Sequence, residues 1–289
     1  MRYLKTNEAA TLLEIAPNTL RMWERRFDFP RPQRSAGGHR SYTHGEVAAL
    51  REALQSGLSI SAAVARARDD VAADANSLVR ALCAYDRDRA DRAIETALVV
   101  RSVERSVEEV LLSSLEEIAG RNGLDSAAWA FAARWAAEWL QRAARLVTLS
   151  RGRLAVVLAH ASRHELDPDV PYIRALELFC IRAGVRVLSL PAGAVSGIGD
   201  AALVYCPDLV VLAGGQLDDD TIARWAYLVA RSVGARPLAL YRPASIRDSG
   251  IVLPSAPGEA QVRVIELADA AMPASVGQLT RTRQRIRAA

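Results

Sequence analysis

Several side chains near the N-terminus of this 289-residue sequence are of the types that bind nucleic acid. Arg21 and Arg25 are four positions apart, so they share one face of any helix that contains both. Arginine on such a face reads base edges or holds phosphate, while cationic and hydroxyl groups on a loop hold phosphate and sugar. We predict DNA contacts from seven residues: Thr19, Arg21, Arg25, Arg34, His39, Arg40 and Tyr42.

Two kinds of element are needed to position these side chains. Thr6 is a suitable N-cap for a short first helix, and Pro17 is suited to the first position of a second one. The stretch FDFPRPQRSAGGHRSYT (residues 27–43) has the prolines and the paired glycines of a two-stranded ribbon with a turn. The expected helices cover residues 7–13, 17–26, 44–55 and 59–68. The pattern therefore predicts a helix-turn-helix followed by a basic wing.

Charge is concentrated in the same region. Eight Lys or Arg against four Asp or Glu give residues 1–45 a net charge of +4, which equals the formal charge of the whole chain. A basic terminal module on a near-neutral body is typical of nucleic-acid-binding proteins. The composition, 51% apolar and 24% charged, favours a globular chain over a disordered one.

The remaining composition bears on the compartment. Three dispersed cysteines, Cys83, Cys180 and Cys206, favour a reducing compartment and no disulfide framework. The sequence shows no secretory start and no apolar run of about 20 residues. We therefore expect a soluble cytoplasmic protein, associated with the nucleoid and without a membrane partner.

The first 70 residues resemble the MerR family of winged-helix regulators. The resemblance is carried by TLRMWERRF (residues 19–27) and by GGHRSY (residues 37–42), which occur in the family's order and spacing. A helix containing Glu46, Val47 and Leu50 follows, as in the family. The resemblance implies a dimer with two-fold symmetry that binds pseudo-palindromic promoter DNA.

Residues 76–150 are expected to be helical almost throughout. A polar, alanine-rich stretch over residues 69–75 precedes them, and we interpret it as a hinge. Apolar residues at helical spacing predict helices over 102–121 and 127–146. Together with the flanking helices these predict a four-helix bundle.

The last helix of this bundle carries the sequence's most aromatic segment. Trp129, Trp135 and Trp139 are suited to the core of the bundle or to the aromatic wall of a ligand pocket. Arg134 and Arg142 on the same helix can hold an anionic group of such a ligand.

Residues 151–275 alternate short apolar segments with helical ones, which predicts a flavodoxin-like α/β domain with a doubly wound parallel sheet. Ligands bind such sheets at the carboxyl ends of the strands, where His160 and His164 are candidate ligand-binding residues. The expected strands cover residues 154–159, 185–190, 209–214 and 237–241, with 251–253 as a fifth candidate. The expected helices cover residues 170–183, 219–233 and 258–271, followed by a basic, disordered tail over 276–289.

The order of winged helix, helical bundle and α/β domain resembles one branch of the MerR family, the cobalamin-binding, light-responsive repressors of carotenoid genes. That branch covers the cofactor from above with a Trp, nine residues and Glu-His, and ligates cobalt from below with Asp/Glu-x-His-x-x-Gly. Here the upper positions hold Ile118, Ala128 and Trp129, and the lower His and Gly are replaced by Asp169 and Tyr172. A carboxylate is a poor cobalt ligand and Tyr fills the space for the nucleotide tail. The sequence therefore predicts that cobalamin is not bound unless His160 or His164 substitutes as the ligand.

We interpret the chain as a DNA-binding transcriptional repressor whose bundle and α/β domain sense a small molecule. Loss of the cobalt-coordinating groups beside three tryptophans favours an apolar or isoprenoid-like ligand with an anionic group. Two alternatives stay open: a cobalamin-dependent light sensor with a non-standard ligand, and a ligand-free regulator whose C-terminal part only oligomerises. The expected partners are double-stranded promoter DNA and further copies of the chain, in a homodimer or homotetramer.

Catalysis is not expected. Neither a nucleophile–base pair nor paired carboxylates stand at a useful spacing, and no metal site is expected. Asp218, Asp219 and Asp220 are instead typical of an acidic helix N-terminus, where they favour the positive end of the helix dipole.

Overall fold

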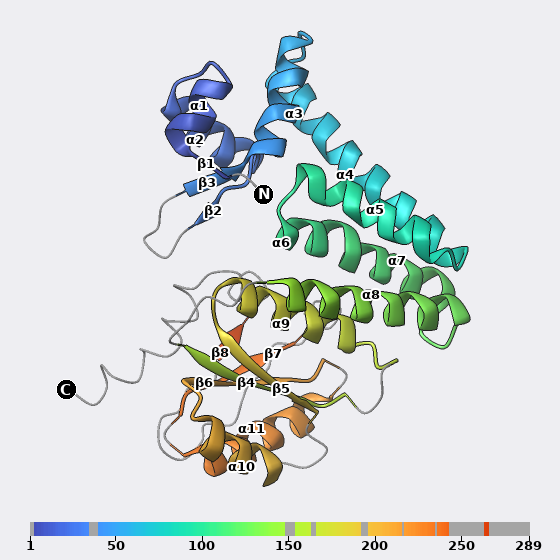
Figure 1. The fold of residues 1–289 in the computed structure, drawn as a ribbon, viewed down its shortest axis with the longest axis vertical. Coiled ribbons are helices and arrows are strands. Elements are labelled where there is room, and N and C mark those ends of the chain that lie inside the picture. The colour runs from blue at the N-terminus through green and yellow to red at the C-terminus, as the bar shows by residue number, and fades with distance from the viewer. Residues whose placement is uncertain are drawn as a thin grey trace, which may run out of the picture. The chain divides into compact units, whose positions relative to one another are not determined.

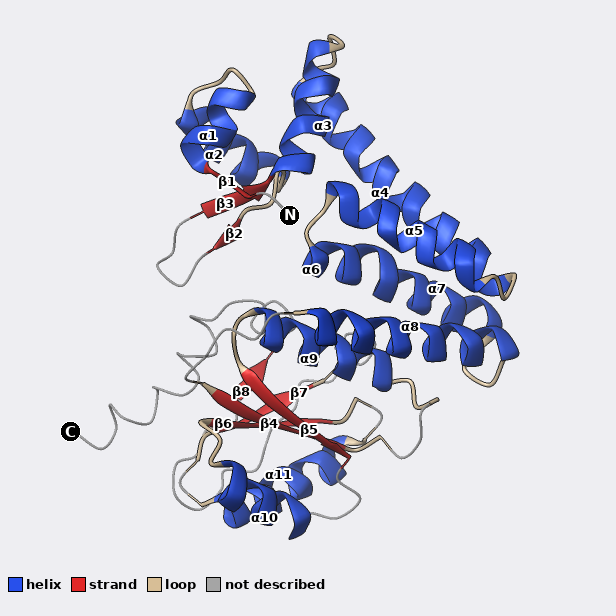
Figure 2. Ribbon diagram, in the orientation of Figure 1, coloured by secondary structure: helices blue, strands red, loops and turns tan. Residues whose placement is uncertain are grey.

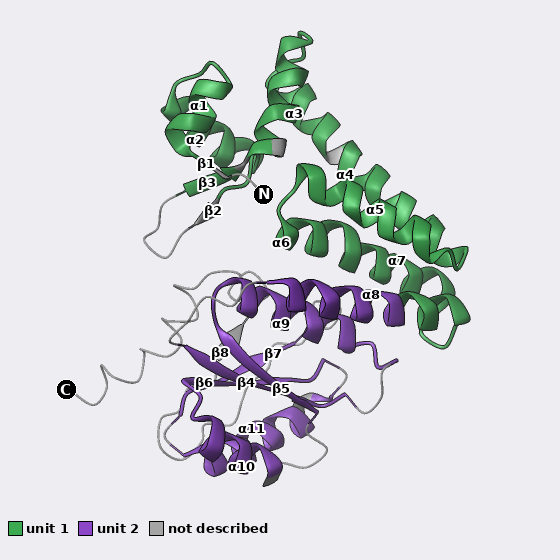
Figure 3. Ribbon diagram, viewed as in Figure 1, with its two compact units in different colours: residues 1–132 green, residues 133–289 purple. Residues whose placement is uncertain are grey.

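The computed structural model describes most of the chain, in two compact units of residues 1–132 and 133–289 (Figure 3). The described residues are 3–34, 40–147, 154–162, 166–191, 196–215, 217–234, 236–242 and 263–265. Helix α8 (Ala127–Leu146) begins in the first unit and continues into the second. Within the described residues, no helix is both long and apolar enough to cross a membrane.

The N-terminal part of the first unit is a small α/β head (Figure 1). Its three strands form an antiparallel sheet in which β3 lies between β1 and β2. Strands β2 and β3 form the two arms of the predicted wing. The elements of the head are β1 (Tyr3–Lys5), α1 (Thr6–Leu12), α2 (Pro17–Phe27), β2 (Gln33–Arg34), β3 (Arg40–Thr43) and α3 (His44–Gln55).

Local sequence explains where these helices begin. The Lys5 amide donates to the Glu8 carboxylate at 2.8 Å, which satisfies a free amide at the start of α1. Pro17 occupies the first turn of α2, where it removes no helical hydrogen bond. The apolar faces of α1, α2 and α3 then share one core, which includes Leu20 and Leu50.

The rest of the first unit is a helical bundle in which α4 packs against α5, η1 and α7. Its elements are α4 (Ile60–Cys83), α5 (Arg87–Val100), α6 (Val103–Arg105), the π-helical segment η1 (Ser106–Leu112) and α7 (Ser113–Asn122). Ser59, Asp86 and Ser102 cap the starts of α4, α5 and α6 with side-chain oxygens. Gly123, with a φ of 84°, follows the end of α7.

The hinge expected over residues 69–75 is wrong, because this stretch lies in the middle of α4. The sequence contains neither glycine nor proline from residue 58 to residue 119. Residues 69–75 are three alanines, three aspartates and Val71, and alanine is the strongest helix former, so this polar stretch continues the helix instead of interrupting it.

The second unit contains a parallel sheet of strand order β5-β4-β6-β7-β8, with α9 on one face and α10 and α11 on the other (Figure 2). This is the doubly wound arrangement that the sequence predicts. Its elements are β4 (Ala155–His160), α9 (Val170–Arg182), β5 (Arg186–Pro191), α10 (Ser196–Tyr205), β6 (Leu209–Ala213), α11 (Asp219–Val233), β7 (Leu238–Tyr241) and β8 (Arg263–Ile265). Strands β4, β6 and β7 pack with α10 and α11 in one apolar cluster.

Two details of this unit differ from expectation. Residues 263–265 form strand β8 beside β7, where a helix over 258–271 was expected, because Val264 and Ile265 are β-branched and extend the sheet. Helix α10 was not foreseen, since Gly197 and Gly199 lower its helix propensity. The candidate strand 251–253 and the basic tail over 276–289 lie outside the described residues.

The continuity of α4 can be tested with Ala72→Pro. Proline in a helix interior removes a backbone hydrogen bond and clashes with the preceding turn, so we expect a loss of about 3 kcal/mol or more in unfolding free energy. Chemical denaturation followed by circular dichroism measures the loss. Ala72→Gly is the matched control and should cost about 1 kcal/mol. A proline variant as stable as the glycine variant would show that residues 69–75 are a hinge after all.

Candidate functional site

Helix α2 presents a basic face to solvent. Arg21 and Arg25 are exposed, and Met22 between them is 45% exposed. Leu20 is fully buried in the core of the head, which fixes the opposite face inward. The Arg21 guanidinium donates to the Asn18 side-chain oxygen at 3.3 Å. The geometry therefore leaves two of the predicted arginines available for a ligand, with Thr19 half-buried beside them.

Strand β3 of the predicted wing is held against α2 by the carboxylate of Glu24. Arg40 of β3 donates from Nε to both oxygens of Glu24, each at 3.0 Å. The Tyr42 hydroxyl donates to the same carboxylate at 3.2 Å. Burial raises the pKa of Tyr42 to about 12, and the Glu24 charge acts in the same direction. Glu24 thus ties the wing strand to the helix that carries the exposed arginines.

These contacts bear on two predicted roles, those of Tyr42 and Arg40. Tyr42 has no exposed surface, so its side chain cannot lie on phosphate as expected. Arg40 is already engaged by Glu24 and is only 29% exposed, so its role in this structure is to hold the wing in place. Strand β2 includes Arg34, whose side chain lies outside the described part, as does all of His39.

Sequence reasoning missed Glu24, although a signal for it was present. Glu24 follows Leu20 by four residues, so the two lie on the same face of α2. Because Leu20 faces the core, a carboxylate on its face needs a cationic or hydroxyl partner. The Arg and Tyr of the wing motif are the partners that it finds.

A second group of polar residues lies at the carboxyl end of β4 in the second unit. His160 is 8% exposed, and its Nδ1 lies 2.5 Å from the Ser162 hydroxyl. Burial, followed by the nearby charge of Arg174, lowers the pKa of His160 to about 4, while Asp167 opposes the shift. His160 is therefore a neutral imidazole at pH 7. His164, the other histidine expected here, lies outside the described residues.

Asp169 lies at the start of α9 and is buried at the same end of the sheet. Its carboxylate accepts a hydrogen bond of 2.7 Å from the Gly215 amide after β6. A Cβ on the neighbouring Gly214 would lie 3.1 Å from Leu217 Cδ1, so the chain approaches closely here. Tyr172, also buried, lies in the first turn of α9. Asp169 thus joins the α9 start to the loop after β6.

The tryptophans of α8 differ in their exposure. Trp135 is fully buried, Trp129 is 3% exposed and Trp139 is half-buried. The Trp129 indole Nε1 is buried and has no hydrogen-bond partner among the described residues. Arg134 and Arg142 are exposed on the same helix, and Arg134 donates to Glu138 at 3.0 Å. Trp135 is therefore a core residue, whereas Trp129 carries an unused donor.

The acidic run before α11 has a structural role. Both Asp218 oxygens accept hydrogen bonds of 2.7 Å from Thr221, one from its amide and one from its hydroxyl. These hydrogen bonds lower the pKa of the exposed Asp218. Asp218 therefore acts as the N-cap of α11, as its position in the sequence suggests.

Comparison with known proteins identifies the head. Residues 4–67 match the family described as MerR HTH family regulatory protein. The chain is similar to the HTH-type transcriptional repressor CarA of Myxococcus xanthus, with 32% identity over 130 residues that cover 41% of this chain and 45% of CarA. It is also similar to the HTH-type transcriptional regulator MlrA of Escherichia coli, with 44% identity over 45 residues that cover 16% of this chain and 18% of MlrA. The chain thus spans less than half the length of either relative, and the resemblance of the head to the MerR family is confirmed.

Two solved structures resemble a larger part of the chain at low identity. One is the methanol:cobalamin methyltransferase complex MtaBC from Methanosarcina barkeri, with 12% identity, a TM-score of 0.32, and coverage of 71% of this chain and 79% of that one. The other is a cobalamin-binding protein from Desulfitobacterium hafniense, with 14% identity, a TM-score of 0.35, and coverage of 71% and 97%. TM-scores this low carry no argument about the ligand.

The buried His160 predicts an acid-labile second unit. Above pH 6.5 the imidazole is neutral in both folded and unfolded chains. Between about pH 6.5 and 4 mainly the unfolded chain binds the proton, so the unfolding free energy should fall by about 2 kcal/mol as the pH is lowered through this window. Denaturant titrations at a series of pH values measure the fall. His160→Gln should lack it, whereas the exposed His44→Gln should retain it; equal slopes for wild type and His160→Gln would contradict the assignment.

Proposed function

We propose that this chain, which carries a MerR-type helix-turn-helix domain over residues 4–67, is a DNA-binding transcriptional repressor. The observation that carries the proposal is the orientation of α2. Leu20 packs into the core of the head and Glu24 is held by Arg40, so Arg21 and Arg25 face outward. A helix with outward arginines beside a two-stranded wing suits the major groove and the phosphates next to it.

The contacting residues have different roles in this proposal. Thr19, Arg21 and Arg25 reach base edges and the adjoining backbone from α2. Arg34 and His39 on the wing hold phosphate, which adds affinity without sequence information. Arg40 and Tyr42 position the wing through Glu24.

The proposal includes repression and assembly into an oligomer. CarA is described as a transcriptional repressor, and its similarity to this chain supports the same sign of regulation. A homodimer or homotetramer would present two heads to the halves of a pseudo-palindromic site, since the symmetry of such a site mirrors that of the protein.

DNA binding is tested with duplexes selected by the full-length protein from a random library. Arg25→Ala should weaken binding to the selected duplex about 5- to 150-fold, because one good arginine contact is worth about 1–3 kcal/mol. If Arg25 binds phosphate, the slope of log affinity against log salt should also fall by about one unit. Fluorescence anisotropy at several salt concentrations measures both quantities.

The matched control is Arg89→Ala, which removes an exposed arginine from α5 outside the head. It should leave the affinity and the slope unchanged. If the wild-type protein selects no duplex, or if Arg25→Ala binds like Arg89→Ala, DNA recognition by α2 is refuted.

For the α8 segment and the α/β domain we propose the sensing of a small molecule that is apolar and carries a hydrogen-bond acceptor or anionic group. The support is the buried indole N–H of Trp129, which has no acceptor among the described residues. A buried donor without a partner costs about 1–3 kcal/mol, so a ligand that supplies an acceptor would be favoured there. Trp139 adds apolar surface, and Arg134 and Arg142 add positive charge on the same helix.

We also propose that this ligand is not cobalamin, and the support comes from the residues at the sheet edge. Asp169 stands where the family's cobalt-ligating imidazole is expected, and its carboxylate is already bonded to the Gly215 amide in a buried position. The buried Tyr172 fills the place of the family's glycine. His160 is the described imidazole nearest in sequence, and its Nδ1 is paired with Ser162.

Addition of hydroxocobalamin to the purified protein should therefore leave the visible spectrum of the cobalamin unchanged, and gel filtration should separate the two. A shifted spectrum that stays with the protein peak would restore the alternative of a cobalamin sensor with a substitute ligand. Native mass spectrometry of the same preparation tests the other alternative. A co-purifying small molecule supports sensing, and an oligomer without one supports a module that only assembles.

A further inference from the structure

We propose that Arg105 and Glu109 of the helical bundle are positioning residues for DNA binding, because they hold the base of the wing through Glu46 and Arg31. The inference rests on the proposed DNA-binding function. It extends that function to residues well beyond the stretch that matches the MerR family, which ends at residue 67. We call the four residues the wing anchor.

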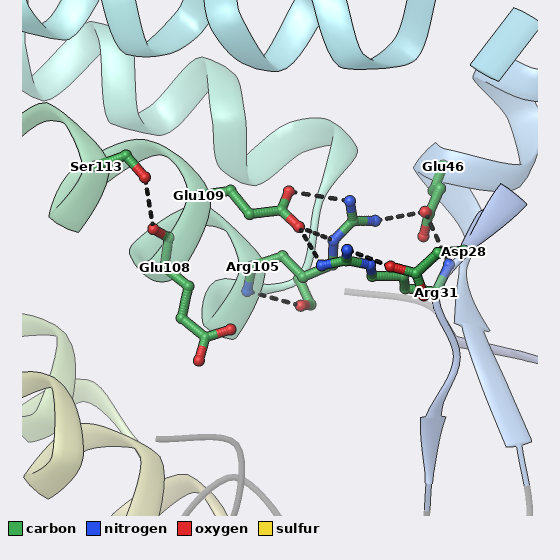
Figure 4. Close-up of polar contacts among 8 residues, drawn as sticks. Asp28, Arg31, Glu46, Arg105, Glu108, Glu109 and Ser113 are labelled. Atoms are coloured by element: carbon green, nitrogen blue, oxygen red, sulfur yellow. Dashed lines mark hydrogen bonds and ion pairs between the residues drawn. The ribbon is translucent and has the colours of Figure 1, made fainter. Parts of the chain in front are cut away.

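The wing anchor joins α3, α6 and η1 to the segment before β2 by hydrogen bonds and ion pairs (Figure 4). Arg105 holds Glu109 with two parallel contacts of 2.9 Å, from Nε and Nη2, and donates from Nη1 to Glu46. The Arg31 amide donates to the same Glu46 oxygen at 3.2 Å. The Arg31 guanidinium contacts Glu109 at 3.4 Å and also pairs with Asp28.

The two residues at the centre of the wing anchor, Glu46 and Arg105, have largely buried side chains. The Glu46 side chain is 4% exposed and that of Arg105 is 15% exposed. Burial raises the pKa of Glu46, and the charge of Arg105 and the hydrogen bond from the Arg31 amide oppose this shift. For Arg105, burial alone would lower the pKa, but the charges of Glu46 and Glu109 raise it overall. Loss of Arg105 would remove the guanidinium that opposes the burial of Glu46, which is unfavourable, whereas Arg105 also has Glu109 as a counter-charge.

The wing anchor contains one residue just before β2 and one just after β3, the two strands of the wing. Arg31 lies between Pro30 and Pro32, two residues before β2, and the fixed φ angles of proline leave this segment few other conformations. Glu46 lies in the first turn of α3, which begins directly after β3. A displacement of Arg105 is therefore transmitted to the start of β2 and to the end of β3 together.

The bundle side of the wing anchor lies on an unusual segment. Arg105 is the last residue of α6, and Glu109 lies in the π-helical segment η1 that follows it. Such segments are rare inside helices and frequent at functional sites. Arg105 and Glu109 are four residues apart, a spacing at which two side chains lie side by side on a helix. Through these contacts, a movement of the bundle helices would change the orientation of the wing.

The test uses the full chain with Arg105→Gln. Hydrogen exchange of the backbone amides over residues 28–34, measured without DNA, should become at least tenfold faster, because Arg105 no longer holds Glu46, the acceptor of the Arg31 amide. With a selected duplex, affinity should fall about tenfold. The hydroxyl-radical footprint should lose the positions that Arg34→Ala also loses, and it should keep those that depend on Arg25. Arg105→Lys keeps the charge but not the two-pronged contact with Glu109, so it should lie between wild type and Arg105→Gln.

Two controls separate positioning from loss of stability. Arg121→Gln removes an ion pair between the exposed Arg121 and the half-buried Glu117 on α7 of the same bundle and should change neither readout. The double variant Glu46→Gln/Arg105→Gln removes both charges of the buried pair, so it should unfold near the wild-type midpoint. Its exchange over residues 28–34 should still be fast and its DNA binding weak.

Unchanged exchange over residues 28–34 in both Arg105 variants would overturn the wing anchor whether or not the protein binds DNA. Faster exchange with an intact wing footprint would overturn its role in DNA binding, whereas absence of DNA binding by the wild type would refute the proposed function itself.

Discussion

The direction in which α2 faces depends on one helical turn. Leu20 and Glu24 stand four residues apart on the same side of the helix, and both are directed toward the head. Leu20 contributes apolar burial, which has no directional preference, while Glu24 contributes a fixed geometry through Arg40 and Tyr42. Because the side of α2 that carries Leu20 and Glu24 packs against the head, Arg21 and Arg25 face solvent. The orientation of the helix and that of the wing are therefore set by the same carboxylate.

A second buried carboxylate extends this arrangement beyond the head. Glu46 accepts from the wing base through the Arg31 amide and from the bundle through Arg105. Arg40 pairs with Glu24 and Arg105 pairs with Glu46, so an arginine side chain supplies the positive charge in both cases, and lysine is nearly absent from the chain. Glu24 thus orders the head internally, and Glu46 connects the head to the helices that follow it.

Much of this architecture can be predicted from local sequence signals. Pro17 and Ser59 mark helix starts that the structure reproduces within one residue, and α8 has the predicted bounds of residues 127 and 146. The alternation of strands and helices after residue 153 gives the correct sheet class. The failures have physical reasons as well. Residues 69–75 are polar but contain no residue that stops a helix, and residues 263–265 become a strand through pairing with β7.

The candidate site was predictable where its geometry is local and not where it depends on distant partners. The outward position of Arg21 and Arg25 follows from helical periodicity alone. The burial of Tyr42 depends on a carboxylate 18 residues away, and the pairing of Glu46 with Arg105 spans 59 residues. No spacing rule links such residues, because their separation is fixed by the packing of whole helices. Likewise, the contact of Asp169 with Gly215 becomes visible only once β4, β6 and α9 are assembled.

The central claim is that the solvent face of α2 enters the groove of duplex DNA. It is tested most directly by photocrosslinking from Met22, the exposed residue between the neighbouring arginine positions of that face. A benzoylphenylalanine at position 22 should crosslink to bases inside the half-site of a selected duplex, and unlabelled duplex should abolish the product. The same group at the exposed Val99 of α5 provides the background level. A yield from position 22 no higher than that from position 99 would contradict the account.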